Sequence, residues 1–274
     1  MRFASVIHDG QPLAVAIDGD RATALRGVTE IGRETPASLL REPLLDDGSL
    51  PLGDLRFRPV VPDPGKVLCI GLNYLAHIQE TQRDESDYPV LFTKFASSLT
   101  GPYDPVPLPP EAEAVDYEGE LVVVIGETTR RVARERALDA VAGYTVGNDV
   151  TMRDYQYKTH QWLQGKAWDA STPVGPWMVG ADELRDPKGL TLRTTVNGQV
   201  VQEASTDLMI FDVATLVSVI SEFTTLNPGD LIFTGTPSGV GFRRDPQLLL
   251  GDGDVVAVEI ERVGRIENRM VSES

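Results

Sequence analysis

Hydrophobic and polar residues alternate in several short stretches of the chain, and a period of two predicts β-strands. The alternation of Phe3, Ser5 and Ile7 with their neighbours, followed by the turn pair Asp9-Gly10, predicts a hairpin over residues 3–18. The turn pair Asn197-Gly198 predicts a second hairpin. Further strands are predicted at residues 67–71, 90–95, 115–126, 143–150, 230–234 and 255–260.

Helical periodicity is rarer along the chain. Apolar residues spaced by three and four predict an amphipathic helix over residues 212–223. Shorter helices are expected at residues 36–41, 73–82 and 133–141. The prolines and glycines of residues 101–110 argue against regular structure there. Because strands outnumber helices and the turn pairs favour antiparallel pairing, the predicted fold class is α+β, mainly β.

A proline-rich stretch, RFRPVVPDPGK at residues 56–66, is typical of a linker. It predicts a small N-terminal domain of residues 1–62 and a larger domain of residues 63–274. The chain has 274 residues, of which 41% are hydrophobic and 24% are charged. This composition is ordinary for a globular protein and is compatible with such a division.

The charge of the chain limits its possible partners. The formal net charge is -16, and the sequence lacks the basic stripe that nucleic-acid-binding proteins carry. Nucleic acid and anionic membranes are therefore not expected partners. The N-terminus lacks the apolar stretch of a signal peptide, and apolar runs are far shorter than a membrane span. With one cysteine, Cys69, and hence no internal disulfide framework, a cytoplasmic location is expected.

The densest group of candidate chemical residues is DYEGE at residues 116–120. On a strand, Asp116, Glu118 and Glu120 point to one face, where three like charges repel. A hard divalent cation would remove this repulsion, and carboxylate oxygens suit Mg²⁺, Mn²⁺ or Ca²⁺. Asp149, at the end of another predicted strand, is a candidate fourth carboxylate. Two alternatives stay open, namely solvated carboxylates on an exposed strand and a helix N-cap at Asp149.

His77 and Glu80 are three residues apart and so share one face of the predicted helix. A carboxylate that orients an imidazole is a general-base arrangement, although a surface ion pair explains the same spacing. Lys166 lies between aromatic residues in the segment QGKAWD, and Lys94 lies in LFTKF. Either lysine could hold a substrate oxygen, or it could be an ordinary surface lysine.

A glycine-rich segment, FTGTPSGVG at residues 233–241, follows a predicted strand. It is not a P-loop, because no lysine follows the glycines. Its backbone amides and the hydroxyl of Thr236 could still bind a carboxylate.

The order of these segments closely resembles the fumarylacetoacetate hydrolase family. The resemblance runs from about residue 66 to residue 266 and is carried by GLNYLAHIQE, FTK, DYEGELVVVIG, GYTVGNDVTMRDYQ, GKAWDASTPVGPW, VNGQVVQ, PGDLIFTGTPSGVG and GDVVAVEIERVG. It implies a mainly β catalytic domain with a mixed β-roll, preceded by a small N-terminal domain. It also implies a homodimer or a larger assembly.

The resemblance implies a role for each candidate residue. The metal ligands would be Glu118, Glu120 and Asp149, with Mg²⁺ or Mn²⁺ as the cofactor and Asp116 in a supporting role. The catalytic residues would be His77, Glu80 and Lys166. The substrate would be bound by Arg153, Gln156, Thr236 and Lys94.

The implied substrate is a small 2-oxo or 1,3-diketo acid. The intact His77 and Glu80 pair favours hydrolysis of a C–C bond in an acylpyruvate such as fumarylpyruvate or acetylpyruvate. Decarboxylation of oxaloacetate and isomerisation of 2-hydroxyhepta-2,4-diene-1,7-dioate are the alternatives on the same site. A non-catalytic ligand-binding protein is the alternative outside enzymes. The polar loop at residues 81–89 is the expected moving part.

Overall fold

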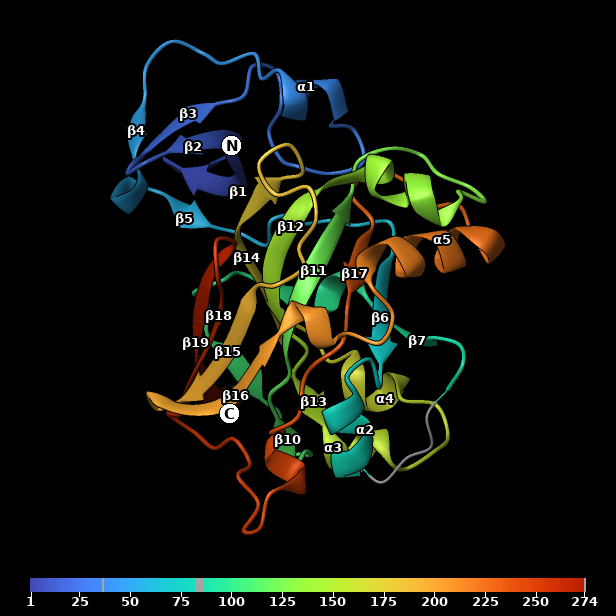
Figure 1. Cartoon of the computed structure of the whole chain (residues 1–274). Helices are drawn as coiled ribbons and strands as arrows, with labels where there is room; N and C mark the ends of the chain where they lie inside the picture. The colour runs from blue at the N-terminus through green and yellow to red at the C-terminus, as the bar shows by residue number, and fades with distance from the viewer. Residues whose placement is uncertain (36, 82–85, 274) are drawn as a thin grey trace.

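A computed structural model describes residues 1–35, 37–81 and 86–273. Its largest sheet forms the middle of the molecule and extends into the N-terminal segment (Figure 1). The strands follow the order β4 (Leu50–Pro51), β3 (Arg21–Ala24), β2 (Gln11–Asp18), β1 (Arg2–His8), β14 (Thr172–Gly180), β12 (Val141–Asn148), β11 (Gly119–Ile125), β17 (Leu231–Phe233), β6 (Val67–Gly71) and β7 (Val90–Lys94). Two short strands pair at its side, β5 (Arg56–Phe57) with β1 and β8 (Leu99–Thr100) with β14.

Two smaller sheets complete the β structure. One has the order β16 (Gln199–Ser205), β15 (Thr191–Val196), β18 (Val255–Ile260), β19 (Gly264–Ser272) and β9 (Val106–Leu108), and the other pairs β10 (Val115–Asp116) with β13 (Thr151–Met152). Most pairs are antiparallel, but β17 with β6, β14 with β8, and β19 with β9 are parallel. The expected α+β, mainly β fold with mixed sheets is therefore confirmed.

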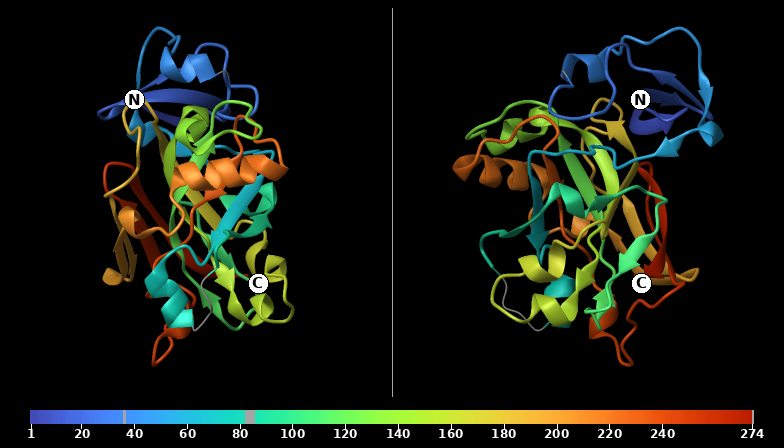
Figure 2. Two further views of the ribbon diagram at one scale, coloured as in Figure 1. Left: turned by 45° about the vertical axis from the view of Figure 1, so that its right-hand side comes forward. Right: turned by 180° about the vertical axis from the view of Figure 1, so that it is seen from behind.

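Helices are few and short. The α-helices are α1 (Ala37–Arg41), α2 (Leu75–Thr81), α3 (Arg153–Gln156), α4 (Leu163–Lys166) and α5 (Val213–Phe223). The 3-10 helices are η1 (Leu52–Asp54), η2 (Ala96–Ser98), η3 (Arg134–Ala140), η4 (Thr206–Leu208) and η5 (Gly241–Arg243). Figure 2 shows α2, α3 and α4 gathered at the end of the molecule opposite the N-terminal strands. In the described part of the chain, no helix has the length and apolar character needed to cross a membrane.

The core lies on both faces of β11. Leu121, Val123 and Ile125 pack into the cluster that contains the apolar face of α5, and Val122 and Val124 pack into the cluster on the other face. A strand buried on both sides has an uninterrupted apolar sequence, which explains the run LVVVI.

Two expectations about single elements are wrong, and one expected helix forms with 3-10 geometry. The predicted strand at residues 115–126 is two strands, because the chain leaves β13 after Asp116 and joins β12 at Gly119. Residues 101–110 contain strand β9, whose Pro107 is tolerated at the edge of its sheet while Val106 and Leu108 are buried. The helix expected at residues 133–141 is the 3-10 helix η3.

The N-terminal hairpin is joined to the rest of the molecule by backbone pairing. Arg2 and Phe3 of β1 pair with Val179 and Met178 of β14. The division of the chain at residues 62 and 63 stays a prediction. Of the polar loop expected at residues 81–89, residues 82–85 lie outside the described part of the chain.

Candidate metal and substrate site

Three buried carboxylates meet where β11 begins and β12 ends. The two strands are antiparallel with Gly119 opposite Asn148, so Glu118, Glu120 and Asp149 are brought together from both. Each can offer an oxygen within 4.8 Å of the others. The backbone N–H of Asp149 donates to the carbonyl oxygen of Glu118 at 2.8 Å, which ties the two strand ends to each other. Asp149 therefore lies in this cluster rather than at a helix N-cap.

Two buried lysines contact the cluster from different sides. Lys166 Nζ lies 2.7 Å from Glu118 Oε2 and 2.7 Å from Asp149 Oδ2. Lys94 Nζ lies 2.6 Å from Asp149 Oδ1 and also donates to the carbonyl oxygens of Val150 and Lys166. Lys166 lines the adjoining pocket, whereas Lys94 is not one of the residues that line it. The position of Lys94 favours holding Asp149 over contacting a substrate.

Arg153 connects Asp116 to Glu118. Its Nη2 lies 2.6 Å from Glu118 Oε1 and 2.8 Å from Asp116 Oδ2. Asp116 also accepts hydrogen bonds from the backbone N–H groups of Gly241 at 2.7 Å and Phe242 at 3.1 Å. The oxygens of Asp116 face Arg153 and this backbone rather than the other three carboxylates. This position is compatible with the supporting role that the family resemblance implies, and the contact with Arg153 would carry that role.

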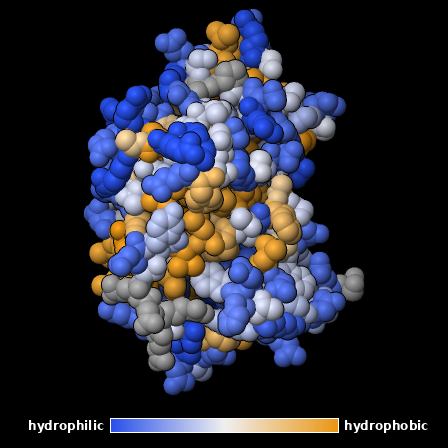
Figure 3. Space-filling view, turned by 90° about the vertical axis from the view of Figure 1, so that its right-hand side faces the viewer, coloured by the Kyte–Doolittle hydropathy of each residue, from blue (hydrophilic) through white to orange (hydrophobic). Residues whose placement is uncertain are grey.

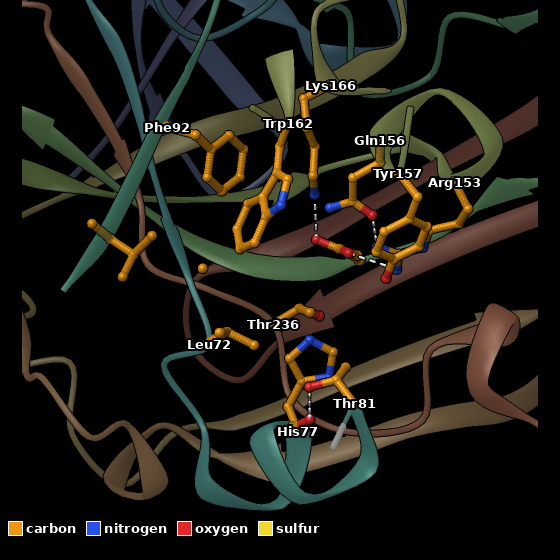
Figure 4. A pocket seen from close by; sticks show the side chains of 13 residues that line it. Leu72, His77, Thr81, Phe92, Arg153, Gln156, Tyr157, Trp162, Lys166 and Thr236 are labelled. Carbon is orange, nitrogen blue, oxygen red and sulfur yellow. Dashed lines mark hydrogen bonds and ion pairs between the residues drawn. The ribbon is translucent and has the colours of Figure 1, made fainter. Parts of the chain in front are cut away.

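His77 and Glu80 lie on α2, which covers the pocket from the other side. His77 Nδ1 lies 3.2 Å from Glu80 Oε2, and Glu80 Oε1 accepts a hydrogen bond from the backbone N–H of Gly239 at 2.9 Å. His77 is buried and lines the pocket together with Thr81. Figure 4 shows Lys166 entering the pocket from one side and His77 from the other.

Gln156 and Thr236 complete the polar wall of the pocket. Gln156 Oε1 accepts a hydrogen bond from Arg153 Nη1 at 3.0 Å. The Thr236 hydroxyl donates to the carbonyl oxygen of Gly119 at 3.0 Å and accepts from Gln202 Nε2 at 2.8 Å. The pocket is lined by Ile70, Gly71, Leu72, His77, Thr81, Phe92, Glu118, Arg153, Gln156, Tyr157, Trp162, Lys166 and Thr236.

The sequence matches a known family over most of its length. A profile described as "Fumarylacetoacetate (FAA) hydrolase C-terminal" matches residues 66–271. The chain belongs to the fumarylacetoacetate hydrolase family. This agrees with the resemblance carried by its sequence segments.

Family relatives have several named activities. The chain is 44% identical to "Oxaloacetate tautomerase FAHD2A, mitochondrial" of Homo sapiens, over 81% of this chain and 71% of that protein. It is 44% identical to "Fumarylacetoacetate hydrolase domain-containing protein 2 homolog" of Dictyostelium discoideum, over 82% of this chain and 77% of that protein.

Solved structures of the family superimpose on the whole chain. The 5-carboxymethyl-2-hydroxymuconate delta-isomerase from Mycobacterium smegmatis has a TM-score of 0.86 at 35% identity, with 100% of both chains covered. The fumarylacetoacetate hydrolase from Exiguobacterium antarcticum has a TM-score of 0.88 at 35% identity, again with 100% of both chains covered. The protein is thus an enzyme of this family, whose members include isomerases and tautomerases by name.

The electrostatics of the carboxylate cluster fit a divalent cation. Burial alone would raise the pKa of Glu118, but Lys166 and Arg153 outweigh it and hold that pKa at about 2. Burial and the negative charges of Asp149 and Glu118 raise the pKa of Glu120 well above its usual range. Within the described residues, Glu120 forms no ion pair. A hard cation bound by the three carboxylates would stabilise the ionised form of Glu120.

Three further side chains of the site have no individual pattern in the sequence that predicts their position. Phe92 and Tyr157 line the pocket, and Lys166 Nζ lies 4.9 Å from the centre of the Phe92 ring. Gln202 accepts a hydrogen bond from the backbone N–H of Gly119 at 3.0 Å and so holds the segment between the two glutamates. Each lies within or directly beside a segment of the family resemblance, which is the one signal that could have identified it.

Proposed function

We propose that this chain is a divalent-metal-dependent tautomerase that interconverts the keto and enol forms of a small 2-oxo acid of the oxaloacetate type. The observation that carries the proposal is the placement of His77 and Lys166 on opposite sides of one pocket, beside the buried carboxylates. A proton acceptor on one side and a cation on the other are the two groups that enolisation requires. Relatives named oxaloacetate tautomerase at 44% identity support the same chemistry.

Lys166 acts in this proposal through its positive charge. Burial opposes that charge, but Asp149 and Glu118 outweigh burial and raise the pKa of Lys166 above its usual range. The ammonium group therefore stays protonated and stabilises negative charge on the substrate oxygen. Mg²⁺ or Mn²⁺, held by Glu118, Glu120 and Asp149, would supply further positive charge for the same purpose.

His77 moves the proton. Because its Nδ1 faces the carboxylate of Glu80, Nδ1 carries the hydrogen and Nε2 has the free lone pair. Nε2 takes a proton from the carbon next to the keto group, which leaves an enolate whose oxygen is stabilised by Lys166. The enolate oxygen takes up one proton from water to give the enol, and His77 releases its proton to water. The reverse direction runs the same steps backwards. The hydrogen bond from Gly239 to Glu80 fixes the orientation of this pair.

The test is the rate at which enol absorbance of freshly dissolved oxaloacetate decays, with enzyme plus Mg²⁺, Mn²⁺ or a chelator. A metal-dependent acceleration is expected, and His77→Asn should lower it by about 100-fold or more. No acceleration under any of these conditions would overturn the proposed activity. Equal acceleration with chelator would overturn the metal dependence.

Hydrolysis of an acylpyruvate is the second candidate. It is favoured by the His77 and Glu80 pair, since the same arrangement can activate a water molecule for attack on a distal carbonyl. Release of pyruvate from acetylpyruvate distinguishes this reaction from tautomerisation, which leaves the composition of the substrate unchanged. Decarboxylation of oxaloacetate would instead release carbon dioxide.

We also propose a homodimer. Large apolar side chains are exposed, and Figure 3 shows apolar surface running across one face of the molecule. Such surface is typical of an interface between subunits. Sedimentation equilibrium should give twice the chain mass of 29.9 kDa, and a monomer at micromolar concentration would contradict the proposal.

A further inference from the structure

The exposed Arg243 lies over two aromatic rings, one of which belongs to the pocket-lining Tyr157. Its guanidinium carbon is 5.9 Å from the centre of the Tyr157 ring and 5.7 Å from that of Phe242. Its Nη2 donates a hydrogen bond to the Tyr157 hydroxyl at 3.4 Å. Tyr157 itself lines the pocket beside Arg153 and Gln156 (Figure 4). Arg243 is therefore connected to the pocket wall through one side chain.

Arg153, Lys166 and Arg244 near the pocket are engaged with other protein groups, and Lys158 Nζ lies 3.2 Å from the centre of the Tyr155 ring. Arg153 and Lys166 each contact two carboxylates. Arg244 donates to the backbone carbonyl oxygens of Gly239 and Val201. In contrast, no carboxylate of the described residues lies within ion-pair distance of Arg243. Its guanidinium is thus available for a negatively charged group that comes from outside.

The backbone beneath Arg243 is fixed relative to the carboxylate cluster. Arg243 ends η5, whose Gly241 and Phe242 N–H groups donate to the buried Asp116. Asp116 in turn holds Arg153, which contacts Glu118. This chain of contacts ties the backbone of η5, from which the Arg243 side chain extends, to the carboxylate cluster.

We propose that Arg243 binds the second carboxylate of a 2-oxo dicarboxylic acid and gives the enzyme its preference for dicarboxylic over monocarboxylic substrates. This inference rests on the proposed function for the 2-oxo end of the substrate. A guanidinium matches a carboxylate with two parallel hydrogen bonds, and the Tyr157 hydroxyl and the two rings hold that of Arg243 next to the pocket wall. In a protein of net charge -16, a dianion needs such a local cation to approach the pocket.

The test compares two substrates that share the HOOC–CO–CH₂ unit and differ beyond it. Oxaloacetate ends in a carboxylate, whereas acetylpyruvate ends in a methyl ketone. Arg243→Gln should lower kcat/KM for oxaloacetate by about 10- to 100-fold, the loss expected for a charged hydrogen bond. For acetylpyruvate, kcat/KM should change by less than about twofold. Arg243→Lys keeps the positive charge but loses the two parallel N–H donors of the guanidinium. Its kcat/KM for oxaloacetate should lie between those of the wild type and Arg243→Gln.

The matched control is Arg136→Gln. Arg136 is exposed, pairs with Asp139 on η3, and does not line the pocket. This variant removes the same charge, so it measures general electrostatic attraction and should leave the preference between the two substrates unchanged. Tyr157→Phe removes the hydroxyl that holds Arg243 and should weaken the oxaloacetate preference by a few-fold.

Equal losses for both substrates in Arg243→Gln, or no loss for oxaloacetate, would overturn the inference while leaving the tautomerase proposal intact. If the wild type turns over neither substrate, the proposed reaction fails. The role of Arg243 in binding is then tested separately, from the dissociation constants of the two compounds. Calorimetric titration with oxaloacetate and acetylpyruvate should show the same 10- to 100-fold selective loss. If the ratio of the two dissociation constants is the same in the wild type and in Arg243→Gln, the inference about Arg243 is overturned.

Discussion

Replacing Glu120 with glutamine tests whether this carboxylate is present for a metal ion. The side chain is buried, and its described polar contact is a hydrogen bond from the backbone N–H of Gly235 at 2.8 Å. Asp149 and Glu118 add negative charge beside it. Glutamine keeps the size and accepts the same hydrogen bond, but it carries no charge.

The expected effect in chelator is a more stable protein. Because the pKa of Glu120 is raised in the fold, folding at pH 7 requires either protonating this carboxyl group or burying its charge, and glutamine removes this cost of about 3–5 kcal/mol. Exchanging the carboxyl group for an amide weakens the hydrogen bond from Gly235 and gives back about 1–2 kcal/mol. The net gain of about 2 kcal/mol corresponds to a rise in Tm of about 4–8 °C for a chain of this size.

When metal is present, the wild type should become more stable than Glu120→Gln. A ligand present at about 100 times its Kd stabilises the wild type by about 2.7 kcal/mol, whereas Glu120→Gln lacks one of the three ligating carboxylates and should gain far less. Thermal melts in chelator and in excess Mn²⁺ measure both effects. Glu203→Gln is the control, since Glu203 is exposed and pairs with Arg193. Its Tm should equal that of the wild type both in chelator and in excess Mn²⁺.

The higher stability of Glu120→Gln over the wild type in chelator should also depend on pH. The pKa of Glu120 is raised in the folded state, so between its unfolded value near 4.5 and its folded value the native state binds more protons than the unfolded state. Glu120 therefore destabilises the wild type increasingly as pH rises above 4.5, and the advantage of the variant should vanish below that pH. A variant that melts below wild type in chelator at pH 7, or that keeps the full stabilisation by Mn²⁺, would refute the reasoning.

Three further outcomes are expected. Lys166→Met should lower kcat by about 100- to 1,000-fold, as expected for loss of one charge-stabilising donor, while the increase in Tm on adding Mn²⁺ persists; a small loss of kcat would contradict the role of Lys166. Asp116→Asn should weaken Mn²⁺ binding by about 10- to 100-fold, measured by titration, because Arg153 then no longer holds Glu118 in place. Asp212 caps α5 through Thr215, so Asp212→Ala should cost about 1 kcal/mol in urea unfolding at pH 7. Burial opposes ionisation of Asp212, but its hydrogen bonds outweigh burial and lower its pKa to about 2, so this cost should shrink as the pH falls from 4 to 2.

The sequence alone determined the features that depend on neighbouring residues. The turn pairs Asp9-Gly10 and Asn197-Gly198 specify their own local backbone, and the structure has both hairpins. The apolar run of β11 and the spacing of Glu118 and Glu120 likewise follow from strand geometry. Recognition of the family, now shown, came from the order of many such segments.

The tertiary structure decided which distant residues meet. The parallel pairing of β17 with β6 joins segments more than 160 residues apart, which no local period encodes. The break before β11 arises because Asp116 pairs with β13 and contacts Arg153, so its carboxylate is directed away from the cluster of Glu118, Glu120 and Asp149. Lys94 proved to contact Asp149, and Arg243 proved to contact the hydroxyl of the pocket-lining Tyr157. The physical reason is that side-chain direction at a strand end depends on the partner strand and on packing, neither of which a single segment contains.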